Sequence, residues 1–385
     1  MAFSYWEREG LLGRVDHVVV GAGIVGMSCA LALRERLPGA TIRVIDRSAL
    51  GDGGTTRNAG FACFGSPSEL FEDLEALGKD AFLELVERRW SGLQRLKQRL
   101  GEDGIGFQPT GSWEIFTGLE GVKSSARVSR CLGALNLLLE PVLGPDVFRP
   151  APEAARAWLA VDAVHSPLEG IIDTAKMVRS FWRLLDEAGI ERVNGLEVTG
   201  FEEGCNGKGV RISTPHGSLD AGQAWICTNA MATELLDDLG KVLLVKPSPN
   251  RVLVTEKLSS LPMEGAFHSE RGYIYYRTVD GRILIGGGRH WGHDKDWVYS
   301  SDGKQALSIM VWDNQLIDFI SDRLGYKPTI EHRWMGWIGV GKKRMPLIGS
   351  ASDRIHYAVR LGGMGVAIGM EVGVSLVEHG LGAKM

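Results

Sequence analysis

The chain has few cysteines, and they are not arranged as in a disulfide framework or a zinc module. There are five in 385 residues, none in a Cys-x-x-Cys pair and none beside a histidine. Disulfide-dependent extracellular domains and zinc modules carry dense, regularly spaced cysteines. The sequence therefore predicts free thiols, a reducing cytoplasmic compartment and no metal site.

A strong charge excess and long apolar runs are also lacking. The 43 basic and 47 acidic side chains leave a formal net charge of −4, so no basic surface is expected and nucleic acid is excluded as a partner. No apolar run approaches the ~20 residues of a membrane-spanning helix. Residues 1–16 include Glu7, Arg8 and Glu9, so we expect neither a signal peptide nor a membrane span.

Glycine, in contrast, is abundant, with 51 residues. An apolar segment at 17–20 leads into Gly21, Gly23 and Gly26, and a second apolar run ends on Asp46. In a strand–turn–helix–strand unit, these glycines allow a tight turn, the approach of a pyrophosphate, and close packing of helix on strand. The helix N-terminus favours phosphate, and the acid accepts hydrogen bonds from a ribose. The motif predicts a bound dinucleotide.

The length predicts two domains, and βα units at both ends with a β-rich middle indicate a nucleotide domain interrupted by a second domain. Ser66, Pro67 and Glu69 predict a capped helix start, with Gly78 ending the helix. Further helices are expected over 24–37, 81–100, 121–140 and 172–188, and from 362–365 to about 379. Strands are expected over 112–117, 197–201, 209–214, 224–228 and 355–361, with an antiparallel meander over 251–256, 272–278 and 282–286.

Because NAD and FAD both use the opening motif, other segments must distinguish them. The loop 55–60 follows the acidic residue, and the apolar run 225–230 ends in small polar residues. A glycine turn at 362–365 starts the last helix. Reduction places negative charge on a flavin, and a helix N-terminus stabilises such charge. Together these segments favour FAD.

In this order and spacing, the motifs resemble the D-amino-acid oxidase/sarcosine oxidase-like (DAO) family of FAD-dependent oxidoreductases, over nearly the whole chain. The matching segments are Gly21–Gly26, Thr55–Gly60, Glu169–Thr174, Trp225–Ala230, Tyr273–Arg277, Arg282–Arg289, Arg333–Gly336, Pro346–Gly349 and Gly362–Val366. The resemblance implies an α/β fold: a glutathione-reductase-type, Rossmann-like FAD domain and a substrate domain on a mixed or antiparallel sheet. We expect the FAD domain at 14–80, 160–235 and 330–383, and the substrate domain at 81–159 and 236–329.

The chain departs from the family pattern at several positions. Trp337 and Ile338 stand where related amino-acid oxidases carry a carboxylate-binding arginine, and Val366 stands where sarcosine oxidases carry a lysine. The oxygen-activating lysine of sarcosine-type enzymes has no match on 284–288. No cysteine for covalent flavin attachment lies near Trp334, so we expect non-covalent FAD. Substrate class and electron acceptor both stay open.

The predicted cofactor-binding residues come from the resembling motifs and the strands beside them. They are Gly21, Gly23, Ile24, Val25, Gly26, Asp46, Arg47, Thr55, Thr56, Arg57, Asn58, Ala59, Gly60, Val198, Thr228, Asn229, Gly336, Gly363, Met364, Gly365 and Val366.

The candidate catalytic residues are Arg57, Arg277, Arg289 and Arg333. Arg277 or Arg289 would clamp a substrate carboxylate, with a surface salt bridge as the alternative. Arg57 would contact the flavin or substrate, or hold the pyrophosphate, whereas Arg333 could equally form a structural ion pair. Secondary candidates are the bases His290 and His332, Arg360, and an aromatic wall of Tyr273, Tyr275, Tyr276, Trp334 and Trp337. Cys63 is expected to be a small buried residue.

The resemblance implies an enzyme that oxidises a small amine or amino acid by hydride transfer to flavin N5, with electrons passing to O2, a quinone or another carrier. The alternatives are an FAD-dependent 2-hydroxy-acid dehydrogenase acting on CH–OH donors, a flavin-binding protein without turnover, and an NAD-dependent dehydrogenase. The sequence leaves open the substrate, its stereochemistry, the oligomeric state and any need for a partner subunit.

Overall fold

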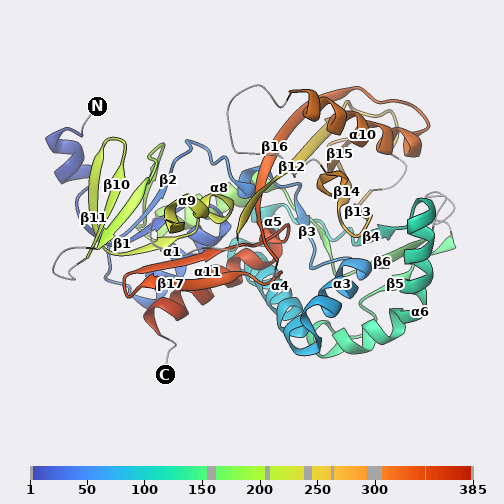
Figure 1. Cartoon of the computed structure of the whole chain (residues 1–385), viewed down its shortest axis with the longest axis horizontal. Coiled ribbons are helices and arrows are strands. Elements are labelled where there is room, and N and C mark those ends of the chain that lie inside the picture. The colour runs from blue at the N-terminus through green and yellow to red at the C-terminus, as the bar shows by residue number, and fades with distance from the viewer. Residues whose placement is uncertain are drawn as a thin grey trace.

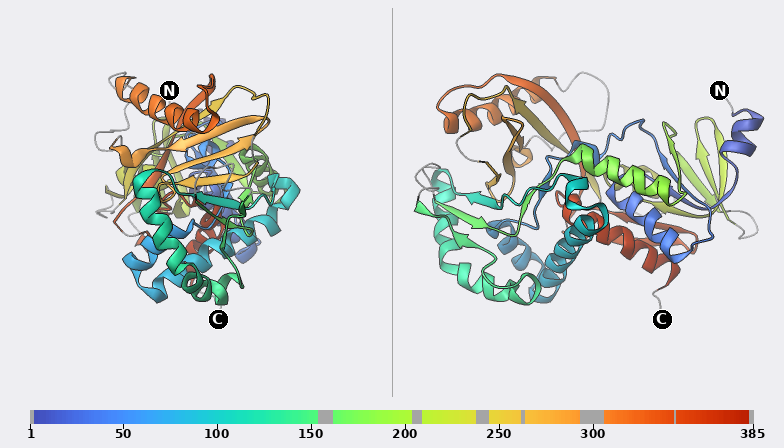
Figure 2. Two further views of the ribbon diagram at one scale, coloured as in Figure 1. Left: turned by 90° about the vertical axis from the view of Figure 1, so that its right-hand side faces the viewer. Right: turned by 180° about the vertical axis from the view of Figure 1, so that it is seen from behind.

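The computed structural model describes residues 3–153, 162–203, 209–237, 245–261, 264–292, 306–342 and 344–382. These form an elongated molecule with one large sheet toward each end, and both termini lie on the side of the first sheet (Figure 1; Figure 2). Within these residues, no helix combines the length and the apolarity that a membrane crossing needs.

The first sheet has the strand order β17-β18-β11-β1-β2-β8, and β10 and β9 extend it antiparallel from β11. Its central strands are parallel and covered on both faces, so they are almost continuously apolar. The strands are β1 (Val15–Val20), β2 (Ile42–Asp46), β8 (Glu191–Asn194), β9 (Gly200–Glu203), β10 (Val210–Thr214), β11 (Gly217–Ile226), β17 (Leu347–Ser352) and β18 (Ile355–Val359).

Helices α1 (Ile24–Arg36), α8 (Thr174–Glu187) and α11 (Gly365–Leu381) share a core with this sheet. Helices α1 and α11 approach closely. A Cβ on Gly369 would lie 2.8 Å from Ile24 Cγ2, and one on Gly373 would lie 2.6 Å from Ser28 Cβ. Because only glycine leaves this space free, the pair fixes how the last helix packs on the first.

The second sheet has the order β16-β12-β15-β14-β13-β4-β6-β5, antiparallel except for the parallel β13–β4 pair. Helix α10 (Ala306–Leu324) packs on one face through Trp312, Leu316 and Ile320. The strands are β4 (Ser112–Ile115), β5 (Arg149–Pro150), β6 (Ala163–Ser166), β12 (Lys246–Thr255), β13 (Ala266–Ser269), β14 (Ile274–Val279), β15 (Arg282–Gly287) and β16 (Ile330–Val340).

Helix α4 (Lys79–Leu100) links two cores. It buries Leu93 and Leu96 beside α11, and Phe82 and Val86 among α3 (Pro67–Leu77) and α6 (Gly118–Leu143). The shorter elements are β3 (Phe61–Ala62), β7 (Gly170–Ile171), α2 (Gly54–Arg57), α5 (Glu102–Ile105), α9 (Ala232–Asp237), η1 (Glu7–Leu11), η2 (Asn229–Met231) and η3 (Arg289–Trp291).

The α/β class, the predicted helices and the antiparallel meander are confirmed. The strand predicted at 197–201 is present but begins later, because β9 pairs only from Gly200, and β11 ends at Ile226, before its predicted end. Ser66 is the N-cap of α3, but its hydroxyl makes no capping bond. Strands β6 and β16 belong to the second sheet, although their residues fall in the segments predicted for the FAD domain. Conversely, α4 was predicted in the substrate domain but packs with the helices of the first sheet. The division into domains stays a prediction.

Candidate functional site

Two adjoining cavities are lined by segments of both sheets. Their volumes are about 300 Å³ and about 400 Å³. Gly54, Asn58, Ile338 and Gly363 line both cavities. The two cavities therefore adjoin, and we call them the first half and the second half of the site.

The first half is built around the turn between β1 and α1. Gly21 has a φ of +101°, and a Cβ there would lie 2.8 Å from the carbonyl oxygen of Cys227. A Cβ on Gly26 would lie 1.8 Å from the Gly21 carbonyl oxygen, so Gly26 packs α1 on the turn and does not line the cavity. Asp46 Oδ2 accepts a 2.8 Å hydrogen bond from the Ala22 N–H and thereby supports the turn. The predicted residues that line this half here are Gly21, Gly23, Ile24, Val25, Asp46 and Arg47.

The segment 54–60 joins the glycine turn to the second half. Thr55 Oγ1 accepts a 3.0 Å hydrogen bond from the N–H of Ile24, the first residue of α1. The Asn58 amide donates to the Thr55 carbonyl, and its oxygen accepts from the Gly60 N–H, both at 2.7 Å. Thr55, Thr56 and Asn58 line the first half, and Arg57, Asn58 and Ala59 line the second.

Polar groups in the first half are left for a ligand. Thr228, Val198 and Asn229 line this half. The Thr228 Oγ1 atom is buried there and has no hydrogen-bond partner within the described residues. The first N–H groups of α1 have no partners inside the helix. A buried polar atom without a partner and a helix N-terminus beside a glycine turn fit the phosphates and sugars of a dinucleotide.

The N-terminus of α11 lies where the two halves meet. Gly363 and Val366 line both halves, Met364 lines the second, and Gly365 lines the first. The loop before the helix is tied to η2, because the Asn229 side-chain oxygen accepts from the N–H groups of Arg360 (3.0 Å) and Leu361 (3.2 Å). The partial positive charge of a helix N-terminus favours an anionic group at this junction.

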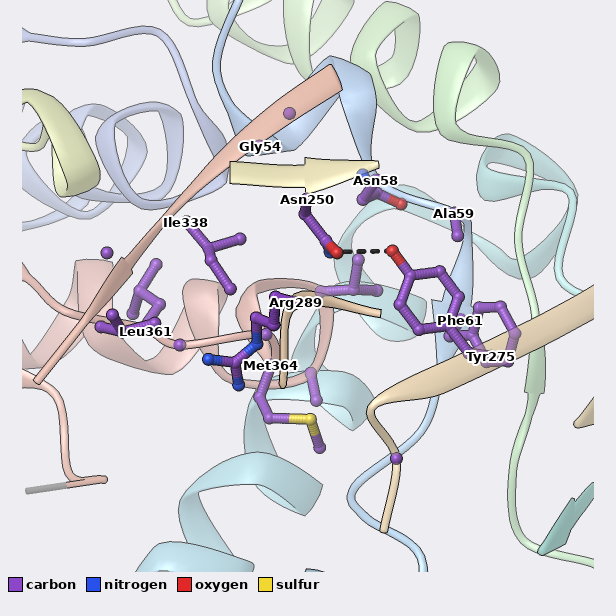
Figure 3. Close-up of a pocket in the computed structure, with 18 of the residues that line it drawn as sticks. Gly54, Asn58, Ala59, Phe61, Asn250, Tyr275, Arg289, Ile338, Leu361 and Met364 are labelled. Atoms are coloured by element: carbon purple, nitrogen blue, oxygen red, sulfur yellow. Dashed lines mark hydrogen bonds between the residues drawn. The ribbon is translucent and has the colours of Figure 1, made fainter. Parts of the chain in front are cut away.

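The second half is lined by side chains from strands of the second sheet (Figure 3). Asn250 donates a 2.8 Å hydrogen bond to the Tyr275 hydroxyl. Burial raises the pKa of Tyr275, so this phenol stays protonated. The Arg289 guanidinium lies 4.8 Å from the centre of the Tyr273 ring. Within the described residues, Arg289 has no carboxylate partner.

Among the charged side chains that line the second half, basic ones outnumber acidic ones. Carboxylates outside the lining neutralise part of this charge: Asp73 pairs with Arg89 at 2.9 Å, and Glu72 pairs with Arg271 at 3.1 Å. Burial raises the pKa of Glu69, the acid among the lining residues, which weakens its negative charge. An anionic molecule suits such a surface. The basic lining residues are Arg57, Arg89, Arg271, Arg289, Lys342, Arg344 and Arg360.

The structure separates the four candidate catalytic arginines. Arg57 and Arg289 line the second half, and Arg57 also donates to the Met335 carbonyl. Arg277 does not line it; its buried guanidinium donates to the carbonyls of Gly60 (2.7 Å) and Ile172 (2.8 Å). Arg333 is half exposed and pairs with Asp313 at 3.4 Å.

The secondary candidates separate in the same way. His290 pairs with Glu270, and His332 is exposed, and neither lines the cavity. Tyr273, Tyr275 and Trp337 line the second half, as does Gly336. Tyr276 and Trp334 do not: Tyr276 stacks on Phe267, and Trp334 donates to the Arg57 carbonyl.

Sequence reasoning missed Asn250, His268, Arg271 and Arg344, which all line the second half. Asn250 and His268 lie on strands of the second sheet, whereas Arg271 and Arg344 lie in loops, so no local pattern groups the four residues.

A family model described as "FAD dependent oxidoreductase" (DAO) matches residues 16–379. Among solved structures, glycine oxidase from Geobacillus kaustophilus is similar at a TM-score of 0.72 and 16% identity, over 97% of this chain and 96% of that one. Iminodiacetate oxidase from Chelativorans sp. BNC1 is similar at a TM-score of 0.71 and 20% identity, over 96% of each chain. L-Proline dehydrogenase from P. horikoshii is similar at a TM-score of 0.70 and 19% identity, over 95% of this chain and 93% of that one. No curated protein matches the sequence.

Proposed function

Because this chain belongs to the DAO family of FAD-dependent oxidoreductases, we propose that it oxidises a small amino acid at the carbon that bears the nitrogen. The observation that carries this substrate class is Arg289, which lines the second half without a carboxylate partner in the described residues. An arginine fork binds a carboxylate through two parallel hydrogen bonds. Arg289 would hold the substrate carboxylate, and the other basic lining residues would attract the anion.

FAD would occupy both halves. The glycine turn and Asp46 would hold its nucleotide end, and the 54–60 segment would pass along its middle. When bound, FAD supplies the acceptor for the hydride. The α11 N-terminus favours negative charge at the junction of the halves. We propose that the cofactor is non-covalent, because strand β16 carries no cysteine where it passes the cavity; acid precipitation should then release all FAD into the supernatant.

The structural relatives support an amine donor over an alcohol donor. By their names, glycine oxidase, iminodiacetate oxidase and L-proline dehydrogenase act on compounds that carry both nitrogen and carboxylate. Tyr275 and Asn250 form a polar pair that would bind substrate next to the carboxylate. No observation here favours the hydroxy acid.

The decisive experiment is anaerobic titration of the FAD-loaded protein with amino acids, amines and 2-hydroxy acids, followed by visible absorption. We expect the oxidised-flavin bands to bleach with an amino acid and not with the matching amine that lacks the carboxylate. Bleaching by hydroxy acids alone would establish the rival dehydrogenase, and bands that no compound bleaches would support a non-catalytic flavoprotein. Admitting air then identifies the acceptor: hydrogen peroxide indicates O2, whereas dye reduction without peroxide indicates a carrier.

A further inference from the structure

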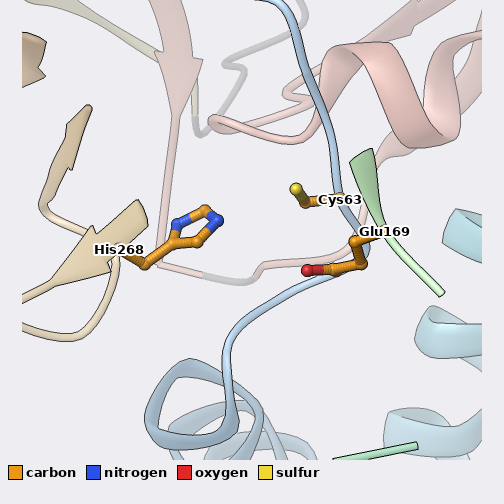
Figure 4. Close-up of side chains that lie close together, drawn as sticks. All are labelled: Cys63, Glu169 and His268. Carbon is orange, nitrogen blue, oxygen red and sulfur yellow. The ribbon is translucent and has the colours of Figure 1, made fainter. Parts of the chain in front are cut away.

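Three side chains that can ligate metal converge beside the second half: Cys63, Glu169 and His268 (Figure 4). Cys63 follows β3, Glu169 precedes β7, and His268 lies on β13. Strands β3 and β7 pair through Ala62 and Gly170, which brings Cys63 next to Glu169. One ligand atom of each residue lies within 4.8 Å of the other two, and all three residues are buried.

The histidine has a free nitrogen in this cluster. His268 is only 8% exposed, and its Nε2 has no hydrogen-bond partner within the described residues. Figure 4 shows a ring nitrogen directed toward Cys63 and Glu169. The Phe61 ring packs edge-on against the imidazole, with centroids 5.1 Å apart, and holds its orientation. Burying a neutral imidazole nitrogen without a hydrogen-bond partner costs free energy of folding, unless that nitrogen ligates a metal ion.

The carboxylate is held in place from behind. Glu169 Oε1 accepts from the N–H groups of Phe64 (2.6 Å) and Gly65 (3.2 Å), and Oε2 accepts from the Ser112 hydroxyl. Outer hydrogen bonds of this kind orient the ligands of metal sites. The Cys63 thiol is buried beside this carboxylate, with which it shares a side-chain hydrogen bond, and it lies 3.7 Å from the Gly170 carbonyl oxygen.

We propose that Cys63, Glu169 and His268 form a binding site for a divalent cation of the zinc class. Thiolate, carboxylate and imidazole are ligands that Zn²⁺ accepts, and two anionic ligands balance its charge in a buried place. Tetrahedral zinc requires ligand atoms about 3.3 to 3.8 Å apart, so rotation of the thiol and small shifts must close the cluster. Cys63 and His268 also line the second half, so the fourth coordination position faces the cavity.

The geometry argues against a Cys–His–Glu nucleophilic triad. A triad needs thiol and carboxylate on opposite nitrogens of the imidazole. Here a single imidazole nitrogen faces both Cys63 and Glu169, and the three ligand atoms lie within 4.8 Å of one another, which suits a coordination site.

The test uses the FAD-loaded protein, freed of metal by a chelator and then titrated with Zn²⁺ against a chromophoric chelator. We expect one Zn²⁺ per chain. Co²⁺ in its place should give the absorption of a thiolate–cobalt bond, which reports on Cys63 in the unmutated protein. C63S and H268Q should each weaken Zn²⁺ binding more than ~100-fold, since even outer-sphere partners contribute about 10- to 100-fold. C131S, which removes a thiol on α6, should bind as the parent does.

Flavin content and the visible spectrum show whether each variant is folded, and the cobalt spectrum needs no variant. The proposal is overturned if the parent binds no Zn²⁺ at stoichiometric concentration, if Co²⁺ binds without a thiolate band, or if folded H268Q retains parental affinity. Each readout is independent of turnover, so failure of the metal site would leave the proposed amino-acid oxidation untouched.

Discussion

The two halves of the cavity are built from different parts of the chain. The first half is centred on backbone groups close in sequence, namely the glycine turn, the α1 N-terminus and the start of the segment 54–60, and the segments 196–199, 227–231 and 361–366 complete it. The second half rests on side chains from distant segments of the second sheet and its connections, including Asn250, His268 and Arg289. Backbone groups bind features that a cofactor always presents, such as phosphates, whereas side chains determine which substrate a site accepts. Mutations should therefore act on cofactor retention in the first half and on substrate choice in the second.

The largest effect is expected from Gly26→Ala, which tests the backbone half. The added Cβ would lie 1.8 Å from the Gly21 carbonyl oxygen, so α1 or the turn must move. We expect a loss of about 4 kcal/mol or more in the free energy of unfolding, together with loss of FAD, measured by chemical denaturation and flavin content. Gly39→Ala is the control, because no atom lies within 4 Å of that Cβ. A Gly26→Ala protein that keeps full FAD would show that the glycine turn does not control cofactor retention.

Arg277→Met tests the connection between the halves. Arg277 donates to the carbonyls of Gly60 and Ile172, and its loss leaves both buried without that donor. We expect the free energy of unfolding to fall by about 3 kcal/mol, with KM for substrate nearly unchanged in FAD-saturated protein. A large rise in KM with unchanged stability would instead restore Arg277 as the substrate clamp.

Arg289→Met tests the side-chain half. Losing a hydrogen-bonded charge pair with the substrate carboxylate costs about 1.5 to 3 kcal/mol, so kcat/KM should fall about 10- to 100-fold while FAD content stays constant. The matched control is Arg333→Met, which removes an exposed arginine while Asp313 keeps Arg251 at 2.6 Å. Equal activity of the two variants would contradict the proposed role.

The smallest expected effect is the change in the free energy of unfolding with pH that comes from Glu114, a buried acid. Burial raises the pKa of Glu114 to about 7, so between its unfolded pKa and 7 the folded protein binds more protons than the unfolded one. Its contribution to stability is therefore lost as pH rises through this range. From pH 6 to pH 8 the parent should lose about 1 kcal/mol more than Glu114→Gln, measured by denaturation at both values. Parallel pH profiles would show that Glu114 does not titrate there.

Much of the fold was predictable because local sequence patterns mark where helices and strands begin and end. Apolar runs, glycine turns and helix stops such as Gly78 and Gly101 place the ends of α3 and α4 correctly, because turn and cap geometry depend on adjacent residues. The strand predicted at 197–201 begins three residues late, because Val198 packs in the core and against the cavity without pairing in the sheet.

The centre of the first half follows from local sequence, because the spacing of Gly21, Gly23 and Gly26 before Asp46 specifies a strand, a turn and a helix start through local sterics. The second half depends instead on how distant strands pack. The sequence offered Arg277 and Arg289 as equivalent candidates, but strand packing buries one against backbone carbonyls and leaves the other in the cavity. It likewise predicted no metal site, since Cys63, Glu169 and His268 are neighbours only after β3 pairs with β7 beside β13. Contacts between distant segments depend on how strands pair and pack, which spacing along the chain does not encode.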